Sequence, residues 1–271
     1  MKKTRAIALL YLLFLLMLSL SGSTSGVLSE AVYFLSFLLP TALGIYLLKR
    51  EGEGERESLL SLGTRSLRLL LPTAAPIILL IILTSSLTSF IIYLVFGAEN
   101  NLNLGDNLPL ALLTHAVLPA ILEEMLFRYL PLRLYGLKSG ATMVLVSSLF
   151  FALVHSDFFV IPYAFLAGAL FMIIDIIAES VWPSVILHVL NNALSVLWIF
   201  YSHNAAFAYA FYALIIIFAV LSLCFIVKRR GEYKAEIQRI FVGERVKLDY
   251  EILYLAVPTL LLAVLDLMAK I

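Results

Sequence analysis

The sequence predicts an all-α fold, a polytopic membrane helical bundle of about eight transmembrane helices. Of its 271 residues, 62% are hydrophobic and only 14% are charged, and the mean hydropathy is +1.03. A soluble domain has roughly half its residues apolar and a quarter charged. Apolar runs long enough to cross a bilayer, about 20 residues each, follow one another along nearly the whole chain. We therefore expect a single membrane domain over residues 1–271.

Eight apolar runs are the candidate spans. They cover residues 7–22, 30–48, 70–96, 108–135, 141–156, 158–178, 182–200 and 206–227. Pro119 is expected to kink the fourth span, because proline lacks a backbone donor and clashes with the preceding turn. The first run follows Lys2, Lys3 and Arg5 and also fits a signal peptide. We favour a transmembrane helix, because counting it makes the charge pattern consistent.

Two segments fall outside the spans. Residues 49–68 are expected to form a charged cytoplasmic loop that leads into an interfacial helix. Residues 228–271 are expected to form a cytoplasmic or interfacial tail. Its apolar end, residues 253–271, fits either a ninth span or a segment along the membrane surface, and we favour the surface.

Lysine and arginine outside the spans fall on one side of the predicted membrane. The connections on the other side, residues 21–29, 98–107, 156–157 and 202–204, contain neither. Because cationic segments are enriched on the cytoplasmic side, we predict an integral multi-pass protein with both termini in the cytoplasm. The net charge of +1, without a basic stripe, argues against a nucleic-acid partner.

Ionisable and amide side chains cluster in three of the spans. A charged side chain at the centre of a membrane helix costs at least about 2.5 kcal/mol and usually faces a functional cavity. The cluster consists of Glu123, Glu124 and Arg128 in the fourth span, His155 at the end of the fifth, and His188, Asn191 and Asn192 in the seventh. We expect five of these side chains to meet in one cavity shielded from lipid: Glu123, Glu124, His155, His188 and Asn192.

Helical spacing assigns the cluster to faces. Glu124 and Arg128 are four residues apart, the best spacing for a helical ion pair. Glu123 lies about 100° further round the helix and is left free for chemistry. His188 and Asn192 are also four residues apart, so they share one face of the seventh span.

If the spans were straight helices, the side chains of the cluster would not all lie at the same depth in the membrane. Glu123 and His155 lie at similar distances from the turn that joins their spans. At about 1.5 Å rise per residue, His188 and Asn192 lie some 5–15 Å nearer the cytoplasm. Helix tilt, the kink at Pro119 or a penetrating loop has to close this gap.

Other polar residues receive no catalytic role. Asn191 is expected to point away from the cluster, because it lies on another face of its helix. His115 and His203 are assigned no function. Asp175 and Glu179 are expected to anchor the cytoplasmic end of the sixth span at the membrane interface.

The residue types in the cluster permit activation of water. A carboxylate shielded from bulk solvent acts as a base near neutral pH, and a histidine on the same water can share the proton. A second histidine and an amide can donate to the developing oxyanion, which is worth roughly 2.7–4 kcal/mol per donor. No serine or cysteine stands out beside these residues as a nucleophile, which favours direct attack by water.

At these residues the sequence resembles the CPBP membrane endopeptidases, the family that holds the type II CAAX prenyl proteases (Ras-converting-enzyme-like). Three motifs carry the resemblance: EExxxR at residues 123–128, FxxxH at 151–155 and HxxxN at 188–192. They lie within a core of about residues 115–200. The resemblance implies cleavage after a prenylated cysteine near a protein's C-terminus, in a cavity open to the cytoplasm and to lipid.

The resemblance also implies a role for each motif residue. Glu123 and His155 would activate water, His188 and Asn192 would stabilise the oxyanion, and Glu124 and Arg128 would support the site. No cofactor is expected. The expected partners are membrane lipids and a peptide or protein substrate, prenylated if the family's activity carries over.

Two alternatives remain open at this point. A zinc-dependent intramembrane metalloprotease could use Glu123, His155 and His188 as ligands and keep a position for water, although no helix carries HExxH. A transporter or lipid-binding scaffold could use the buried charges as a proton or ion relay. That alternative is weakened because no internal repeat of broken helices is evident.

Overall fold

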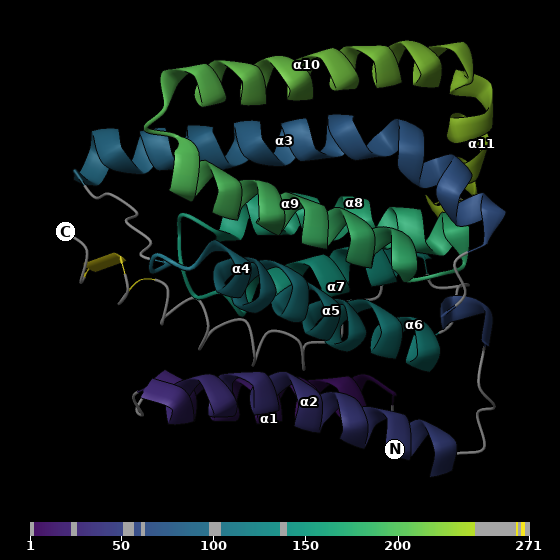
Figure 1. The fold of residues 1–271 in the computed structure, drawn as a ribbon. Coiled ribbons are helices and arrows are strands. Elements are labelled where there is room, and N and C mark those ends of the chain that lie inside the picture. Colours follow the sequence, from purple (N-terminus) through teal and green to yellow (C-terminus); the bar gives the residue numbers. More distant parts are fainter. Residues whose placement is uncertain are drawn as a thin grey trace.

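Helices and the short connections between them make up the described structure (Figure 1). The computed structural model describes residues 3–22, 26–50, 57–60, 63–97, 104–135, 140–241, 264, 267 and 268. Over these residues the fold contains no strand. The all-α prediction is therefore confirmed.

Among the residues that the structure describes, eight continuous helices and one helical turn frame the bundle. They are α1 (Lys3–Gly22), α2 (Gly26–Arg50), η1 (Glu57–Leu60), α3 (Thr64–Phe96), α7 (Gly140–Leu153), α8 (Ile161–Ala178), α9 (Trp182–Tyr201), α10 (Ala205–Lys228) and α11 (Arg230–Phe241). The fourth predicted span is built from shorter pieces. These are α4 (Leu108–Ala111), η2 (Leu112–Val117), α5 (Leu118–Glu124), η3 (Met125–Tyr129) and α6 (Leu130–Tyr135).

Six described helical stretches are long and apolar enough to cross a membrane. They are Ala31–Arg50, Arg68–Phe96, Leu108–Arg133, Ile161–Ala178, Trp182–Tyr201 and Ala205–Lys228. Leu9–Ser21 and Gly140–Leu153 are shorter apolar helices. Together these stretches coincide with the predicted spans and confirm a polytopic helical bundle.

The fourth span is interrupted where the sequence predicts a kink. Pro119 stands in the first turn of α5, and the turn before it, η2, is a π-helix. The wider π turn accommodates the proline, which lacks an N–H and whose ring would clash with the carbonyl four residues earlier. A second π-helical turn, η3, follows the glutamates and carries Arg128. Such turns are frequent at functional sites.

Aromatic packing joins the N-terminal hairpin to the fourth span. The Phe127 ring lies between Tyr11 of α1, at 5.2 Å between centroids, and Phe151 of α7, at 5.7 Å. Phe14 meets the same ring edge-on at 5.8 Å. All four side chains are buried. Helix α1 is thereby part of the core that fixes the position of η3.

The segment before α3 differs from the expected loop and interfacial helix. Helix α3 runs without a break from Thr64 to Phe96, so Arg65 and Arg68 lie in its first turns and not in a separate helix. The turn η1 packs on the connection between α8 and α9, where the Trp182 indole N–H donates to the Leu60 carbonyl at 2.7 Å. Residues 51–56, 61 and 62 lie outside the described part of the chain.

The two ends of the bundle carry different connections (Figure 1). The last residues of α2, α6 and α10 and the first of α3 lie at one end, together with α11. The last residues of α3 and α9 and the first of α4 and α10 lie at the other. Beyond α11, Leu267 packs against Ile92 and Phe159, but residues 242–263 lie outside the described structure, so the placement of the tail stays a prediction.

Candidate active site

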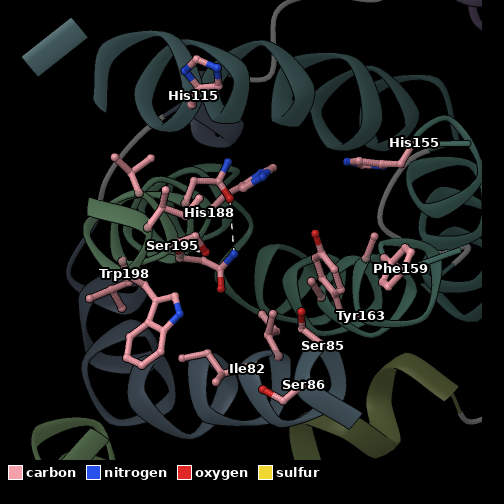
Figure 2. Close-up of a pocket in the computed structure, with 18 of the residues that line it drawn as sticks. Ile82, Ser85, Ser86, His115, His155, Phe159, Tyr163, His188, Ser195 and Trp198 are labelled. Atoms are coloured by element: carbon pink, nitrogen blue, oxygen red, sulfur yellow. Dashed lines mark hydrogen bonds between the residues drawn. The ribbon is translucent and has the colours of Figure 1, made fainter. Parts of the chain in front are cut away.

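A cavity of about 540 Å³ lies between α3, the fourth span, α8 and α9 (Figure 2). Side chains from all three sequence motifs line it: Glu123, His155, His188, Asn191 and Asn192. The sequence therefore brings its polar membrane residues into one space. Glu124 and Arg128 do not line the cavity but lie behind its wall.

The predicted ion pair in the fourth span is present. The Arg128 Nε lies 3.2 Å from Glu124 Oε2, and both side chains are fully buried. The Arg128 guanidinium also stacks over the Phe151 ring, 4.1 Å from its centroid, a cation–π contact that strengthens when water is excluded. The pair fills the interior of the bundle and neutralises two charges that would each be costly alone.

His188 lies between the two glutamates. Its Nδ1 is 2.8 Å from Glu124 Oε1, a hydrogen bond, and its Nε2 is 3.7 Å from Glu123 Oε2. A carboxylate on one ring nitrogen fixes the orientation of an imidazole and directs the other nitrogen to the chemistry. Glu124 therefore orients His188, whose Nε2 faces the side of Glu123. The Glu123 side chain keeps 10% exposure whereas that of Glu124 has none.

His155 approaches the cavity from the end of α7. Its Nδ1 is 2.7 Å from the Phe151 carbonyl oxygen, so Nε2 is the nitrogen left for chemistry. The Phe151 ring meets His155 edge-on at 5.1 Å and His188 at 5.5 Å. The two histidines thus flank one aromatic ring and lie on facing sides of the cavity (Figure 2).

Asn191 differs from expectation, whereas Asn192 lines the cavity as expected. Asn191 was expected to point away, but it lines the cavity beside Asn192 and donates from Nδ2 to Asn192 Oδ1 at 3.3 Å. Adjacent helical residues diverge by about 100°, which still lets both reach a wide cavity. The bond occupies the Asn192 carbonyl oxygen and leaves its N–H₂ group as the donor available to a ligand.

Asp175 is not at the membrane interface, contrary to the prediction. Its side chain is fully buried, and its Oδ1 accepts the Ser184 backbone N–H at 3.1 Å. Asp175 also interacts electrostatically with Glu124 and Arg128. In the sequence, this buried position was indicated by an aspartate within an apolar run. Its position beneath the ion pair depends on how α8 and α9 pack.

Close helix packing gives the buried arginine its room. A Cβ on Gly168 of α8 would lie 3.0 Å from Ser148 Cα of α7 and 3.4 Å from the nearest Arg128 guanidinium nitrogen. The missing side chain therefore lets α7 and α8 approach and leaves space for the guanidinium. Small residues at helix crossings have this effect in membrane bundles.

The sequence did not lead us to predict that α3 forms one wall of the cavity. Ser85, Ser86 and Ser89 line the cavity, and a run of hydroxyl residues inside an apolar span was the available signal. His115, which had no assigned role, lines the cavity as well and its Nδ1 is 2.8 Å from Thr114 Oγ1. His203 stands in the loop between α9 and α10 and is not among the lining residues.

The zinc alternative requires three side chains of the cavity to converge on one metal ion. Within the described residues, no group of three or more histidine, cysteine, aspartate or glutamate side chains could hold a metal ion. Glu123, His155 and His188, the three ligands that zinc would need, line one cavity without converging on a single point. Within the described part of the chain, the placement of these three side chains gives no support to a zinc site.

Comparison with known families agrees with this geometry. Residues 105–194, from just before α4 to the middle of α9, match the family model described as Rce1-like, type II CAAX prenyl endopeptidase. No curated protein and no solved structure gives a significant match. The matched segment holds all three sequence motifs and is similar to endopeptidases of the CAAX type. The match covers 90 of the 271 residues, and over this segment the chain resembles the Rce1-like family.

Proposed function

We propose that the protein hydrolyses a peptide bond inside the membrane with water activated by Glu123 and His155. One observation carries this proposal. His188 is held between Glu124, at 2.8 Å, and Glu123, at 3.7 Å, on the wall of a cavity that His155 also lines. A base, a proton-sharing histidine and oriented donors around one wet space are the components of hydrolysis without a covalent intermediate.

The reaction begins with a water molecule beside Glu123 and His155. Its oxygen adds to the scissile carbonyl carbon while its proton passes to the Glu123 carboxylate. The carbonyl oxygen becomes an oxyanion, which accepts hydrogen bonds from the His188 Nε2–H and the Asn192 amide. When the intermediate collapses, the C–N bond breaks and the leaving nitrogen takes the proton from Glu123. The products are a carboxylate and an amine.

Glu123 is the base in this scheme because Glu124 is occupied on both oxygens. Glu124 accepts from His188 through Oε1 and pairs with Arg128 through Oε2, and its side chain has no exposure. It cannot reach a water molecule in the cavity. Its role is to hold the His188 ring beside Glu123, while Arg128 balances the charge of Glu124.

The substrate that the family supports is a peptide with a prenylated CAAX-type C-terminus. The family model carries CAAX prenyl endopeptidase in its description. The cavity also has the mixed character that a lipid-modified peptide needs, with serine hydroxyls on one wall and Trp198, Phe211 and Tyr212 on another. Membrane lipids and such a peptide are the proposed partners, and no cofactor takes part.

Cleavage of a farnesylated CAAX peptide by purified protein in detergent tests the proposal. Glu123→Ala, His155→Ala and His188→Ala are each expected to lower kcat by about 10²–10⁴, the usual contribution of a general acid or base. His203→Ala is the matched control, because this histidine lies outside the cavity. If the first two variants cleave as fast as the wild type while folding normally, the assigned roles are wrong.

A further inference from the structure

Tyr163 lines the cavity but has no part in the reaction described above. It is a partly buried residue in the first turn of α8. Its hydroxyl points into the space between His155 and His188 (Figure 2). Among the described residues, none forms a hydrogen bond with this hydroxyl. A tyrosine hydroxyl inside a protein usually has a hydrogen-bond partner, so this donor is available to a molecule that enters the cavity.

The turn between α7 and α8 fixes Tyr163 relative to His155. Ser156 has a left-handed backbone conformation, with a φ of 50°, which turns the chain directly after His155. The Asp157 side chain then accepts the Phe159 backbone N–H at 2.8 Å, and the Asp157 carbonyl accepts the first N–H of α8 at 2.9 Å. One hydrogen-bonded turn therefore carries both His155 and Tyr163 to the cavity.

One face of α8 forms this wall of the cavity. The residues of α8 that line it are Tyr163, Ala164, Ala167 and Phe171, a spacing that places them along one side of a helix. The Phe171 ring contacts the His188 ring at 5.8 Å between centroids. The Tyr163 ring packs against the apolar cluster that α3, α8 and α9 form. Packing thus holds the ring of Tyr163 and leaves its hydroxyl in the cavity.

The Tyr163 hydroxyl lies in the electric field of the proposed base. It interacts electrostatically with Glu123 and with Asp157 of the α7–α8 connection. When water attacks, its proton moves to Glu123, and the negative charge moves from that carboxylate to the scissile carbonyl oxygen. A donor that is not hydrogen-bonded to the carboxylate beforehand, and that meets the new charge, favours the transition state over the bound substrate.

We propose that Tyr163 is a further catalytic residue, whose hydroxyl donates a hydrogen bond to the oxyanion from the α8 wall of the cavity. The inference rests on the proposed hydrolytic function. In that function water lies beside Glu123 and His155 and the oxyanion lies beside His188 and Asn192, so the scissile carbonyl occupies the space into which Tyr163 points. No proton leaves the phenol. The hydroxyl adds one donor to the two that α9 supplies.

Tyr163→Phe tests the proposal, because it removes the hydroxyl and keeps the ring. With a farnesylated CAAX peptide and purified protein in detergent, kcat is expected to fall by about 10²–10³, the usual loss when one oxyanion donor is removed, while KM stays nearly unchanged. The unfolding midpoint should also stay unchanged. A wild-type kcat, a rise in KM alone or a lower unfolding midpoint would each overturn the proposal.

Tyr209→Phe is the matched control. Tyr209 of α10 is 78% exposed and is not among the residues that line the cavity. The same substitution there should leave kcat, KM and the unfolding midpoint at their wild-type values. An equal loss of kcat in both variants would mean that the effect does not arise in the cavity, and would overturn the proposal.

Two inhibitors separate binding of the transition state from binding of the substrate. A farnesylated peptide with a phosphinate in place of the scissile amide presents the tetrahedral centre and its negative oxygen. Tyr163→Phe should weaken inhibition by this compound by the same factor as it lowers kcat/KM. An alkene isostere has no oxygen at that position and should inhibit both proteins equally. Undiminished inhibition by the phosphinate would overturn the proposal.

The same assays distinguish the failure of this inference from that of the proposed function. If Glu123→Gln loses cleavage while Tyr163→Phe keeps it, hydrolysis by Glu123 stands and the role of Tyr163 is wrong. If the wild-type protein cleaves no peptide, the proposed function is wrong and the role of Tyr163 falls with it.

Discussion

The ion pair behind the active-site wall provides a quantitative test of the structure. Arg128→Met removes the guanidinium and leaves the Glu124 carboxylate in a site with no exposure. Breaking a buried pair by removing one partner costs about 3–5 kcal/mol, because the remaining charge stays desolvated. At about 2–4 °C per kcal/mol for a protein of this size, the unfolding midpoint should fall by about 6–20 °C. His188 remains as a partner of Glu124, which places the expected loss near the lower end.

A surface pair of the same length is the matched control. Arg239 and Glu236 of α11 are also 3.2 Å apart, but their side chains are 52% and 34% exposed. An exposed pair contributes about 0–1 kcal/mol, so Arg239→Met should leave the unfolding midpoint nearly unchanged. Heating in detergent, followed by tryptophan fluorescence or by aggregation, measures both variants. Equal shifts for the two substitutions would refute the reasoning from burial.

Three further predictions concern packing, buried polar groups and metal. Gly168→Ala should destabilise the protein by about 1–3 kcal/mol, because the new Cβ would lie 3.0 Å from the Ser148 backbone. Gly63→Ala should be neutral, because nothing lies within 4 Å of its Cβ position. Thermal unfolding compares the two variants. Asp175→Leu should lower the free energy of unfolding by about 1–3 kcal/mol, because the Ser184 N–H loses its acceptor. Asp175→Asn keeps an acceptor and should lower the free energy of unfolding less in the same assay. Peptide cleavage should survive exhaustive chelation, and loss of activity restored by zinc would instead support the metalloprotease.

Local patterns in the sequence predicted the fold well. Hydropathy identifies spans one at a time, and the helices fall where the apolar runs stand. The pairing of Glu124 with Arg128 was predictable for the same reason, because residues four apart on a helix are neighbours whatever surrounds them. The kink at Pro119 was also local. The structure was needed only to show that the kink takes the form of a π turn before the proline.

Features that depend on how helices pack were not predictable. Straight helices placed His188 some 5–15 Å nearer the cytoplasm than Glu123, yet His188 Nε2 lies 3.7 Å from Glu123 Oε2. Two π turns break the fourth span, so counting residues from a turn misjudges its depth. Asp175 was assigned to the interface because nothing in its own helix reveals the partners on α9.

The base in the cavity is tested most directly by the isosteric substitution Glu123→Gln, measured as kcat for the farnesylated peptide in detergent. Glutamine keeps the size of the side chain and cannot accept the proton of water. Turnover should fall by about 10²–10⁴ with the unfolding midpoint unchanged. A folded Glu123→Gln protein that turns over at the wild-type rate would contradict hydrolysis at this site.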